Sequence, residues 1–202
     1  MNKQGLAYTV IFTFVVSFVF VLFLSFANQT TAPMVELNRE LARQRSVLVA
    51  LGIDFDSAED VQQRFAEIDQ VTKDGELLFR AQLPSGDAFA KEFEGAGVWG
   101  PIKGVIAVTA DFERTLGLEI VEQNDTPGLG GRITEQWFKD QLRGLRIVDG
   151  IIRVGSAGTG DDDKENGTID AITGATGTSA RMGRIFRDEL TRLGELLNGG
   201  AL

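Results

Sequence analysis

The sequence contains no cysteine and no histidine among its 202 residues. Without cysteine the chain cannot form disulfides, thiolate metal sites, covalent haem links or cysteine-ligated iron–sulfur clusters. Without histidine it has no imidazole metal ligand and no histidine-based catalytic triad. If the protein takes part in redox chemistry, an organic cofactor must therefore supply that chemistry.

Basic residues are fewer than acidic ones, with 20 Lys and Arg against 29 Asp and Glu and a formal net charge of −9. Nucleic-acid phosphates require a basic face, so we expect no nucleic-acid partner. Glycine, in contrast, is abundant at 24 residues, many of them in clusters. These clusters predict tight loops that approach a ligand or another backbone segment closely.

Charge is also absent from residues 6–27, a mostly apolar stretch of 22 residues. A helix needs roughly 20 such residues to cross the hydrocarbon core of a membrane, so we predict one transmembrane helix here. A cleaved signal peptide is the alternative, because Ser25-Phe26-Ala27 resembles a small-x-small cleavage site. The run is, however, longer than the usual ~7–15 residue apolar core of a signal peptide, which favours a retained anchor.

Positive charges flank this segment on both sides. Lys3 and the amino terminus precede it, whereas Arg39, Arg43 and Arg45 follow it among glutamates. Short positive tails tend to stay in the cytoplasm, and the remainder of this chain is acidic. We therefore expect residues 1–5 to form a short cytoplasmic tail, residues 6–27 to span the membrane, and residues 28–202 to form one exported domain.

Helical patterns lie at both ends of this domain. Leucines at helical spacing predict an amphipathic helix over residues 34–51 that ends at Gly52. Residues 179–198 predict a closing helix, whose apolar face would consist of Met182, Ile185, Phe186, Leu190, Leu193 and Leu197.

Strand patterns occupy the middle of the chain. Residues 105–109 and 118–121 are typical of strands, and residues 146–154 predict a hairpin around Asp149-Gly150. A further hairpin turn is expected at Asp74-Gly75. Residues 155–167, which are rich in Asp, predict a polar surface loop. The fold class is therefore α+β: one N-terminal transmembrane helix, then a mostly antiparallel sheet with flanking helices.

Two blocks of sequence hold more chemistry than plain structure requires. Residues 170–179 read Asp-Ala-Ile-Thr-Gly-Ala-Thr-Gly-Thr-Ser and precede the closing helix. Taken alone, they could cap that helix, or bind a phosphate at its N terminus, where backbone N–H groups are unpaired. Residues 126–131 read Thr-Pro-Gly-Leu-Gly-Gly, which alone could be a tight turn.

These blocks, together with the apolar N-terminal segment and Val98-Trp99-Gly100-Pro101, occur in an order that resembles the FMN-binding domain family. Within this family the chain is most similar to the C subunit of the sodium-translocating NADH:quinone reductase, through Trp99-Gly100-Pro101 and residues 45–53. The G subunit of the Rnf electron transport complex shares the two later blocks. The resemblance covers most of the chain.

The resemblance implies a covalently bound FMN, whose phosphate a flavin transferase esterifies to the hydroxyl of Thr176. Gly174 and Ala175 would keep the approach to this hydroxyl open, and Thr173 begins the same signature. The phosphodiester would lie near the N terminus of the closing helix, where N–H groups favour negative charge. Asp170 is either a recognition or loop-shaping residue or an ordinary turn aspartate.

The resemblance also implies contacts to the isoalloxazine ring from the second block. Thr126 and Leu129 would touch the ring, while Gly128 and Gly130 supply closely approaching backbone. Trp99 and Gly100 would lie nearby, although Trp99 on its own could be a core tryptophan. The family often has His and Glu ahead of Thr-Pro-Gly, and this chain has Gln123 and Asp125 instead. An imidazole near the flavin is therefore not expected.

The implied function is that of an electron-transfer subunit in a membrane respiratory complex, relaying electrons from NADH towards quinone. Other membrane subunits would be its partners, and the chain would not be catalytic alone. The resemblance further implies the bacterial inner membrane, with the domain facing the periplasm. An Rnf-type subunit or a stand-alone membrane-anchored flavin carrier is one alternative, and a non-redox membrane-tethered binding domain is another.

Overall fold

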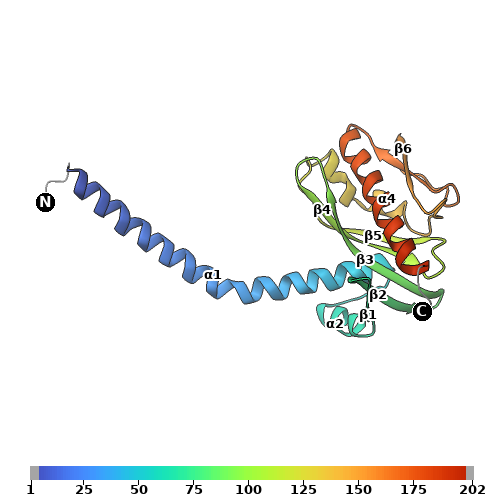
Figure 1. Ribbon diagram of the computed structural model, residues 1–202, viewed down its shortest axis with the longest axis horizontal. Coiled ribbons are helices and arrows are strands. Elements are labelled where there is room, and N and C mark those ends of the chain that lie inside the picture. The colour runs from blue at the N-terminus through green and yellow to red at the C-terminus, as the bar shows by residue number, and fades with distance from the viewer. Residues whose placement is uncertain (1–4, 199–202) are drawn as a thin grey trace. The chain divides into compact units, whose positions relative to one another are not determined.

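The computed structural model describes residues 5–198, which form four α-helices, one short 3₁₀-helix and seven strands (Figure 1). Most of the expected tail, and residues 199–202 at the end of the expected domain, lie outside the described residues. In chain order the elements are α1 (Leu6–Leu51), α2 (Ala58–Ala66), β1 (Asp69–Lys73), β2 (Glu76–Leu83), β3 (Gly86–Ala96), β4 (Pro101–Thr109), β5 (Thr115–Glu122), η1 (Gly130–Thr134), α3 (Gln136–Asp140), β6 (Arg153–Gly158), β7 (Thr168–Ile172) and α4 (Thr176–Asn198).

The helix α1 is continuous from Leu6 to Leu51, with Pro33 inside it. By length and composition it is the one helix among residues 5–198 that could cross a membrane, and its apolar part is not buried by other described residues. Contacts divide the chain into a unit that ends at Glu40 and a folded domain that begins at Leu41. The helix predicted over residues 34–51 is confirmed as the last part of α1, and Gly52 ends it with φ of 74°.

Strands β1 to β5 form one antiparallel sheet in which each strand pairs with the next along the chain. The turn Asp74-Gly75 joins the first two strands with φ of 50° and 81°, the left-handed pair typical of a two-residue hairpin. The strands predicted at residues 105–109 and 118–121 are parts of β4 and β5. The predicted α+β class, an antiparallel sheet with flanking helices, is confirmed.

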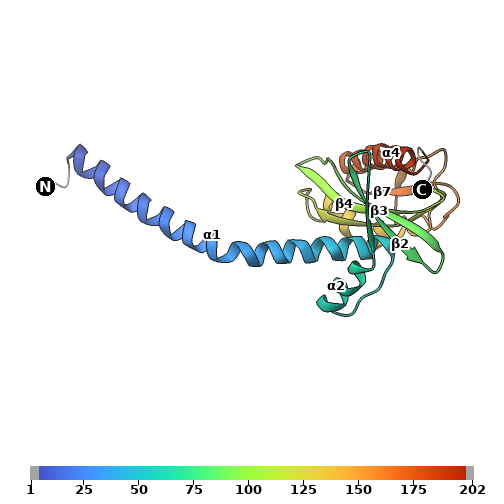
Figure 2. The same ribbon diagram turned by 60° about the horizontal axis from the view of Figure 1, so that its bottom comes forward.

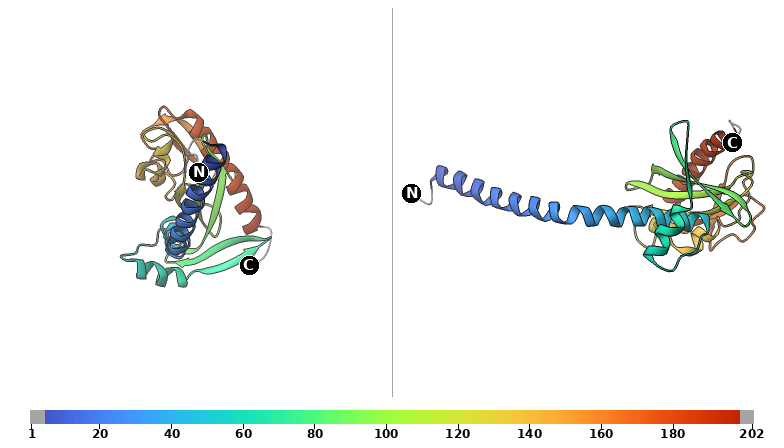
Figure 3. Two further views of the ribbon diagram at one scale, coloured as in Figure 1. Left: turned by 90° about the vertical axis from the view of Figure 1, so that its left-hand side faces the viewer. Right: turned by 90° about the horizontal axis from the view of Figure 1, so that it is seen from below.

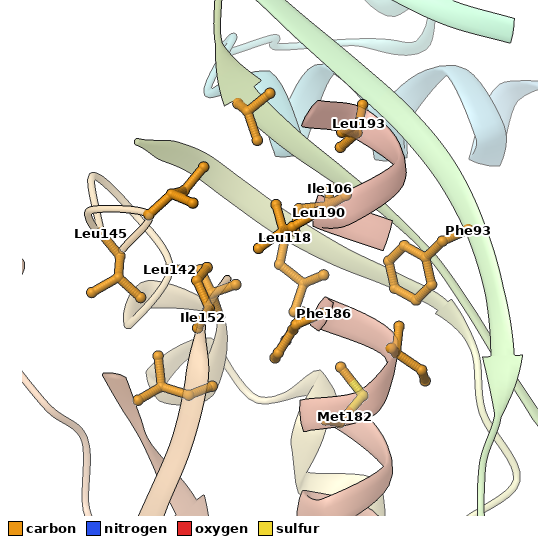
Figure 4. Packing of buried hydrophobic residues seen from close by; sticks show 14 of the residues in the cluster. Phe93, Ile106, Leu118, Leu142, Leu145, Ile152, Met182, Phe186, Leu190 and Leu193 are labelled. Atoms are coloured by element: carbon orange, nitrogen blue, oxygen red, sulfur yellow. The ribbon is translucent and has the colours of Figure 1, made fainter. Parts of the chain in front are cut away.

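Side chains of this sheet enter two separate cores. On one face Phe93, Ile106 and Leu118 pack against α4 (Figure 4). On the other face Phe79 and Val105 pack with side chains of α2 and of the last turns of α1. Successive side chains of a strand point to opposite faces, so neighbours in β4 enter different cores. Figures 2 and 3 show α4 and α2 on opposite sides of the sheet.

The closing helix α4 covers the first of these cores. Its predicted apolar face is confirmed, since Met182, Ile185, Phe186, Leu190, Leu193 and Leu197 are all buried. The helix begins at Thr176, three residues before the predicted start at Ser179. The carbonyl of Ala175 already accepts the N–H of Ser179 at 3.0 Å, so residues 176–178 form the first helical turn.

The region after Arg146 differs from the expectation. Asp149 and Gly150 form the predicted turn, but only Val148 and Ile151 bridge across it, so the extended hairpin over residues 146–154 is wrong. From Arg153 the chain instead forms β6, which pairs in parallel with β7. The predicted loop over residues 155–167 is therefore wrong for residues 155–158, which belong to β6. Parallel partners are distant along the chain, so local alternation does not reveal this pairing.

We predict that the last part of α1 contributes to the stability of the domain. Leu48 is fully buried in the second core, whereas Leu37 of the same helix is 56% exposed. Leu48→Ala should lower the free energy of unfolding by about 2–5 kcal/mol, because it leaves a cavity. Leu37→Ala should change it by less than about 0.5 kcal/mol. Urea unfolding of the full chain in mild detergent, followed by tryptophan fluorescence, measures both; equal effects would contradict the prediction.

Candidate functional site

Thr176 is the first residue of α4 and follows the turn that ends β7. Gly174 in this turn has φ of 78°, a backbone conformation that favours glycine. The side chain of Thr176 is exposed, and its hydroxyl makes no hydrogen bond to any residue in the described range 5–198. This threonine therefore offers an accessible hydroxyl at the N terminus of a 23-residue helix.

The block around Thr176 contains four hydroxyl side chains, of which the fold uses two. The hydroxyl of Thr178 donates to Asp125 Oδ2 at 2.6 Å, and Ser179 Oγ accepts a backbone N–H of β7 at 3.0 Å. Thr178 and Ser179 are both buried. Thr173 and Thr176 are exposed. An external reagent can thus reach the hydroxyls of Thr173 and Thr176 but not those of the other two.

Asp125 connects the three segments that surround Thr176. Its Oδ1 accepts the backbone N–H groups of Val98 and Trp99, both at 3.2 Å, while its Oδ2 accepts the hydroxyl of Thr178. The residue is only 5% exposed. One buried carboxylate therefore holds together the loop between β3 and β4, the turn before η1 and the first turn of α4.

The glycines of the site lie where a larger residue would collide. A Cβ on Gly130 would come within 2.2 Å of Thr178 Oγ1, so the turn can pack on α4 only with glycine here. A Cβ on Gly174 would lie 3.3 Å from Leu129 Cδ2, and one on Gly177 would lie 3.3 Å from Val98 Cγ2. Backbone, rather than side chains, thus forms much of the surface between these apolar residues.

These segments enclose a shallow hollow of about 180 Å³ beside Thr176. Most of the residues predicted from the sequence meet here, namely Trp99, Thr126, Leu129, Gly130, Gly174, Ala175 and Thr176. The hollow is also lined by residues to which the sequence assigned no role: Val98, Asp125, Gly177 and Thr178. The inward position of Thr178 could have been inferred from the sequence, because Thr178 lies four residues before Met182 and therefore on the same face of the helix.

Three exposed apolar side chains border this hollow: Val98 at 39%, Trp99 at 73% and Leu129 at 45% exposure. Among the described residues from Leu41 onward, Val121 is the only other large hydrophobic residue in this exposed class. Trp99 is therefore not a core tryptophan. Apolar side chains gathered at one exposed point are typical of a binding site. The hollow can hold a flat, partly apolar ligand, with a free hydroxyl at its edge.

Two predicted residues support the site from outside the hollow. Gly100 closes the loop between β3 and β4, because its carbonyl accepts the N–H of Gly97 at 2.8 Å. Gly128 has φ of 75° and forms the left-handed step of the turn before Leu129.

The other two predicted residues lie away from the hollow. Thr173 is exposed on the turn but does not line the hollow. Asp170 lies in β7, where its carboxylate accepts the N–H of Gly160 at 3.1 Å. Its own N–H donates to Gln141 Oε1 at 2.7 Å. Asp170 therefore shapes the loop after β6.

The segments that form this site are similar to a known type of domain. Residues 97–191 match the family described as the FMN-binding domain. The matched range contains the Val98 loop, the turn at Leu129 and the block around Thr176. The resemblance inferred from these motifs is therefore confirmed.

Curated relatives share a more specific name. The chain is 31% identical over 138 residues to the C subunit of Na(+)-translocating NADH-quinone reductase from Pasteurella multocida (strain Pm70), an alignment that covers 65% of this chain and 50% of the relative. It is 37% identical over 89 residues to the protein of the same name from Neisseria meningitidis serogroup B (strain ATCC BAA-335 / MC58), covering 42% and 33%. The chain spans about half the length, or less, of these relatives.

Two solved structures share the fold. The C subunit of Na(+)-translocating NADH-quinone reductase from Parabacteroides distasonis superimposes with a TM-score of 0.68 at 20% identity, covering 83% of this chain and 97% of that chain. NqrC from Shewanella oneidensis superimposes with a TM-score of 0.66 at 20% identity, covering 78% and 96%. At this identity the likeness concerns the fold alone.

We predict that Asp125 determines the order of the Trp99 loop. Asp125→Ala leaves the N–H groups of Val98 and Trp99 and the hydroxyl of Thr178 without their acceptor, which should lower the free energy of unfolding by about 1–3 kcal/mol. The anisotropy of Trp99 fluorescence, measured in a Trp137→Phe background, should also fall.

Two further variants serve as controls for this prediction. Asp125→Asn keeps a carbonyl acceptor and should have a smaller effect. Asp162→Ala removes an exposed carboxylate in the loop after β6 and should have none. An unchanged anisotropy in Asp125→Ala would contradict the assigned role.

Proposed function

We propose that this chain is a covalent-FMN electron-transfer subunit of a membrane respiratory complex and relays electrons from NADH towards quinone. One observation carries the proposal: the exposed hydroxyl of Thr176 borders a hollow edged by Trp99 and Leu129, both exposed apolar residues. The matched family and the names of the curated relatives support it.

The residues of the site fit the two ends of FMN. Thr176 provides a hydroxyl for the phosphate, and the N terminus of α4 provides unpaired N–H groups and positive potential for its negative charge. Trp99 and Leu129 provide apolar surfaces for the ring, and the backbone of Gly130 and Gly174 leaves room between them. When bound, FMN supplies the redox chemistry that the side chains of this chain cannot.

Attachment requires a maturation partner, because no described residue at the site is placed to activate Thr176. In the proposed step a bond forms between Thr176 Oγ1 and the flavin phosphorus, and the phosphoanhydride bond of a flavin dinucleotide donor breaks. The hydroxyl proton leaves through the transferase, and a nucleoside monophosphate is released. The exposure of Thr176 supports entry of this turn into the active site of the transferase.

Of the two exposed hydroxyls, that of Thr176 is better placed than that of Thr173 to carry the flavin phosphate. Thr176 lines the hollow and begins α4, whereas Thr173 lies on the turn and lines no part of the hollow. A phosphate on Thr176 is therefore next to both the helix N terminus and the apolar edge.

The chain requires neighbouring subunits as electron donor and acceptor, since it has no cysteine or histidine with which to hold a metal as a second redox centre beside the flavin. We propose that residues 1–5 stay in the cytoplasm, that residues 6–27 span the inner membrane, and that residues 28–202 face the periplasm. The uncharged first part of α1 and the acidic domain support this arrangement. The other membrane subunits would exchange electrons with the exposed edge of the site, so the chain would not be catalytic alone.

Thr176→Val is predicted to abolish covalent flavin, because it removes the acceptor hydroxyl and keeps the side-chain shape. Flavin fluorescence of the denatured chain in a gel should disappear, and the stability should change by less than about 0.5 kcal/mol at this exposed position. Thr173→Val is the matched control and should keep full fluorescence. Flavin that persists on the Thr176→Val chain, or is lost only in Thr173→Val, would overturn the assignment.

The topology and the assembly have their own test. Protease added to intact spheroplasts should remove the domain, and mild-detergent extraction should recover the chain in a particle much larger than its own 21.9 kDa. Protection of the domain would reverse the proposed orientation. A monomer in every mild detergent would instead favour a stand-alone carrier.

A further inference from the structure

A second and larger hollow also borders Thr176. It has a volume of about 600 Å³ and lies between β6 and the first half of α4, and we call it the β6–α4 groove. Thr176 is the one residue that lines both this groove and the hollow beside Trp99. A group attached to Thr176 is therefore next to two separate concave surfaces.

The groove follows one face of α4. The helix lines it with Thr176, Ser179, Ala180, Gly183 and Arg187, which recur every three to four residues and so share a face. At 1.5 Å per residue this face is roughly 16 Å long from Thr176 to Arg187. The opposite wall is β6, where Ser156 and Ala157 present small side chains and Gly155 presents none.

Small residues bring the two walls of the groove close together at one point. A Cβ on Gly183 would lie 3.3 Å from Val154 Cγ2, so α4 and β6 approach closely at this point. Ile151 and Ile152 extend the apolar lining beyond β6. These walls suit a planar ring better than a bulky, branched ligand.

The charge of the groove is opposite to that of the whole chain. Its lining includes Arg153 and Arg187 but no Asp or Glu, although the chain carries a net charge of −9. Arg187 makes no ion pair with any described residue. Arg153 makes one, an exposed ion pair in which its Nη2 lies 3.4 Å from Asp149 Oδ2. Side chains of a helix lean towards its N terminus, so Arg187 extends in the direction of Thr176. The groove therefore offers unused N–H donors to carbonyl or anionic groups.

We propose that the β6–α4 groove is a second binding site for the flavin ring that Thr176 carries. The ring is planar and partly apolar, which matches the walls, and its carbonyl edge matches the donors of Arg187. The chain of single bonds between phosphate and ring gives access to both surfaces from one attachment point. The inference rests on the proposed attachment of FMN to Thr176 and adds a second position for the ring.

The two positions differ in their aromatic neighbours. The hollow contains Trp99, and tryptophan quenches excited flavin by electron transfer over short distances. The lining of the groove contains no aromatic residue. A ring that divides its time between the two surfaces therefore has a short and a long fluorescence lifetime.

Time-resolved flavin fluorescence of the full, flavin-loaded chain in mild detergent tests the proposal. We expect two lifetimes, and the long-lived component should rotate with the domain rather than freely. Trp99→Phe should lengthen the short lifetime only. Ala180→Leu, at an exposed helical position in the groove, should remove the slowly rotating long component. The control Arg184→Leu adds the same side chain to α4 outside the groove and should keep both components.

Arg187 gives a second, independent measurement. Arg187→Gln should reduce the amplitude of the long component about three- to tenfold, because a charged donor is lost. Arg184→Gln, which removes another exposed arginine of α4 that has no ion pair among residues 5–198, should leave it unchanged.

Two results would overturn the second site. They are a single lifetime in the unmodified chain, and a long component that survives both Ala180→Leu and Arg187→Gln. In-gel fluorescence of the denatured chains separates these outcomes from a failure of attachment. If the unmodified chain itself carried no covalent flavin, the proposed function and the second site would both be wrong.

Discussion

The arrangement of the site depends on one buried carboxylate. Asp125 accepts two backbone N–H groups and one hydroxyl from residues that are 26, 27 and 53 positions away along the chain. Within the described residues these bonds fix the Trp99 loop against the first turn of α4. Val98 and Trp99 can then stay ordered beside Thr176 although their side chains are exposed, because the hydrogen bonds to Asp125 hold their backbone.

Glycine makes this contact possible. The turn that carries Leu129 can approach α4 because Gly130 has no side chain where Thr178 and Asp125 meet. The same block of sequence therefore has two roles that are physically linked: Leu129 is exposed at the edge of the hollow, and Gly130 packs against the carboxylate of Asp125. A side chain added at Gly130 would therefore also displace Leu129.

Local features of the fold were predictable from the sequence, and distant pairings were not. The inward face of α4 and the turns at Gly75 and Gly150 depend on residues that are near in sequence, and all are present. The parallel pair of β6 and β7 depends on strands 15 residues apart in register, as at Arg153 and Thr168, and local alternation indicated a hairpin instead. In the site, the motifs predicted Thr176 and Leu129, which both line the hollow, but the role of Asp125 depends on partners in two other segments, the Trp99 loop and the first turn of α4.

The last turns of α1 have a consequence for how the domain can be separated from its anchor. Val47, Leu48 and Leu51 are side chains of the second core, and the folded unit begins at Leu41. A cut at Gly52, where the helix ends, would remove one wall of this core and expose Phe79 and Val105 to water. A cut just before Leu41 would leave the core whole. The boundary between anchor and domain therefore lies inside a continuous helix. A soluble fragment that begins at the end of this helix would lack part of its core.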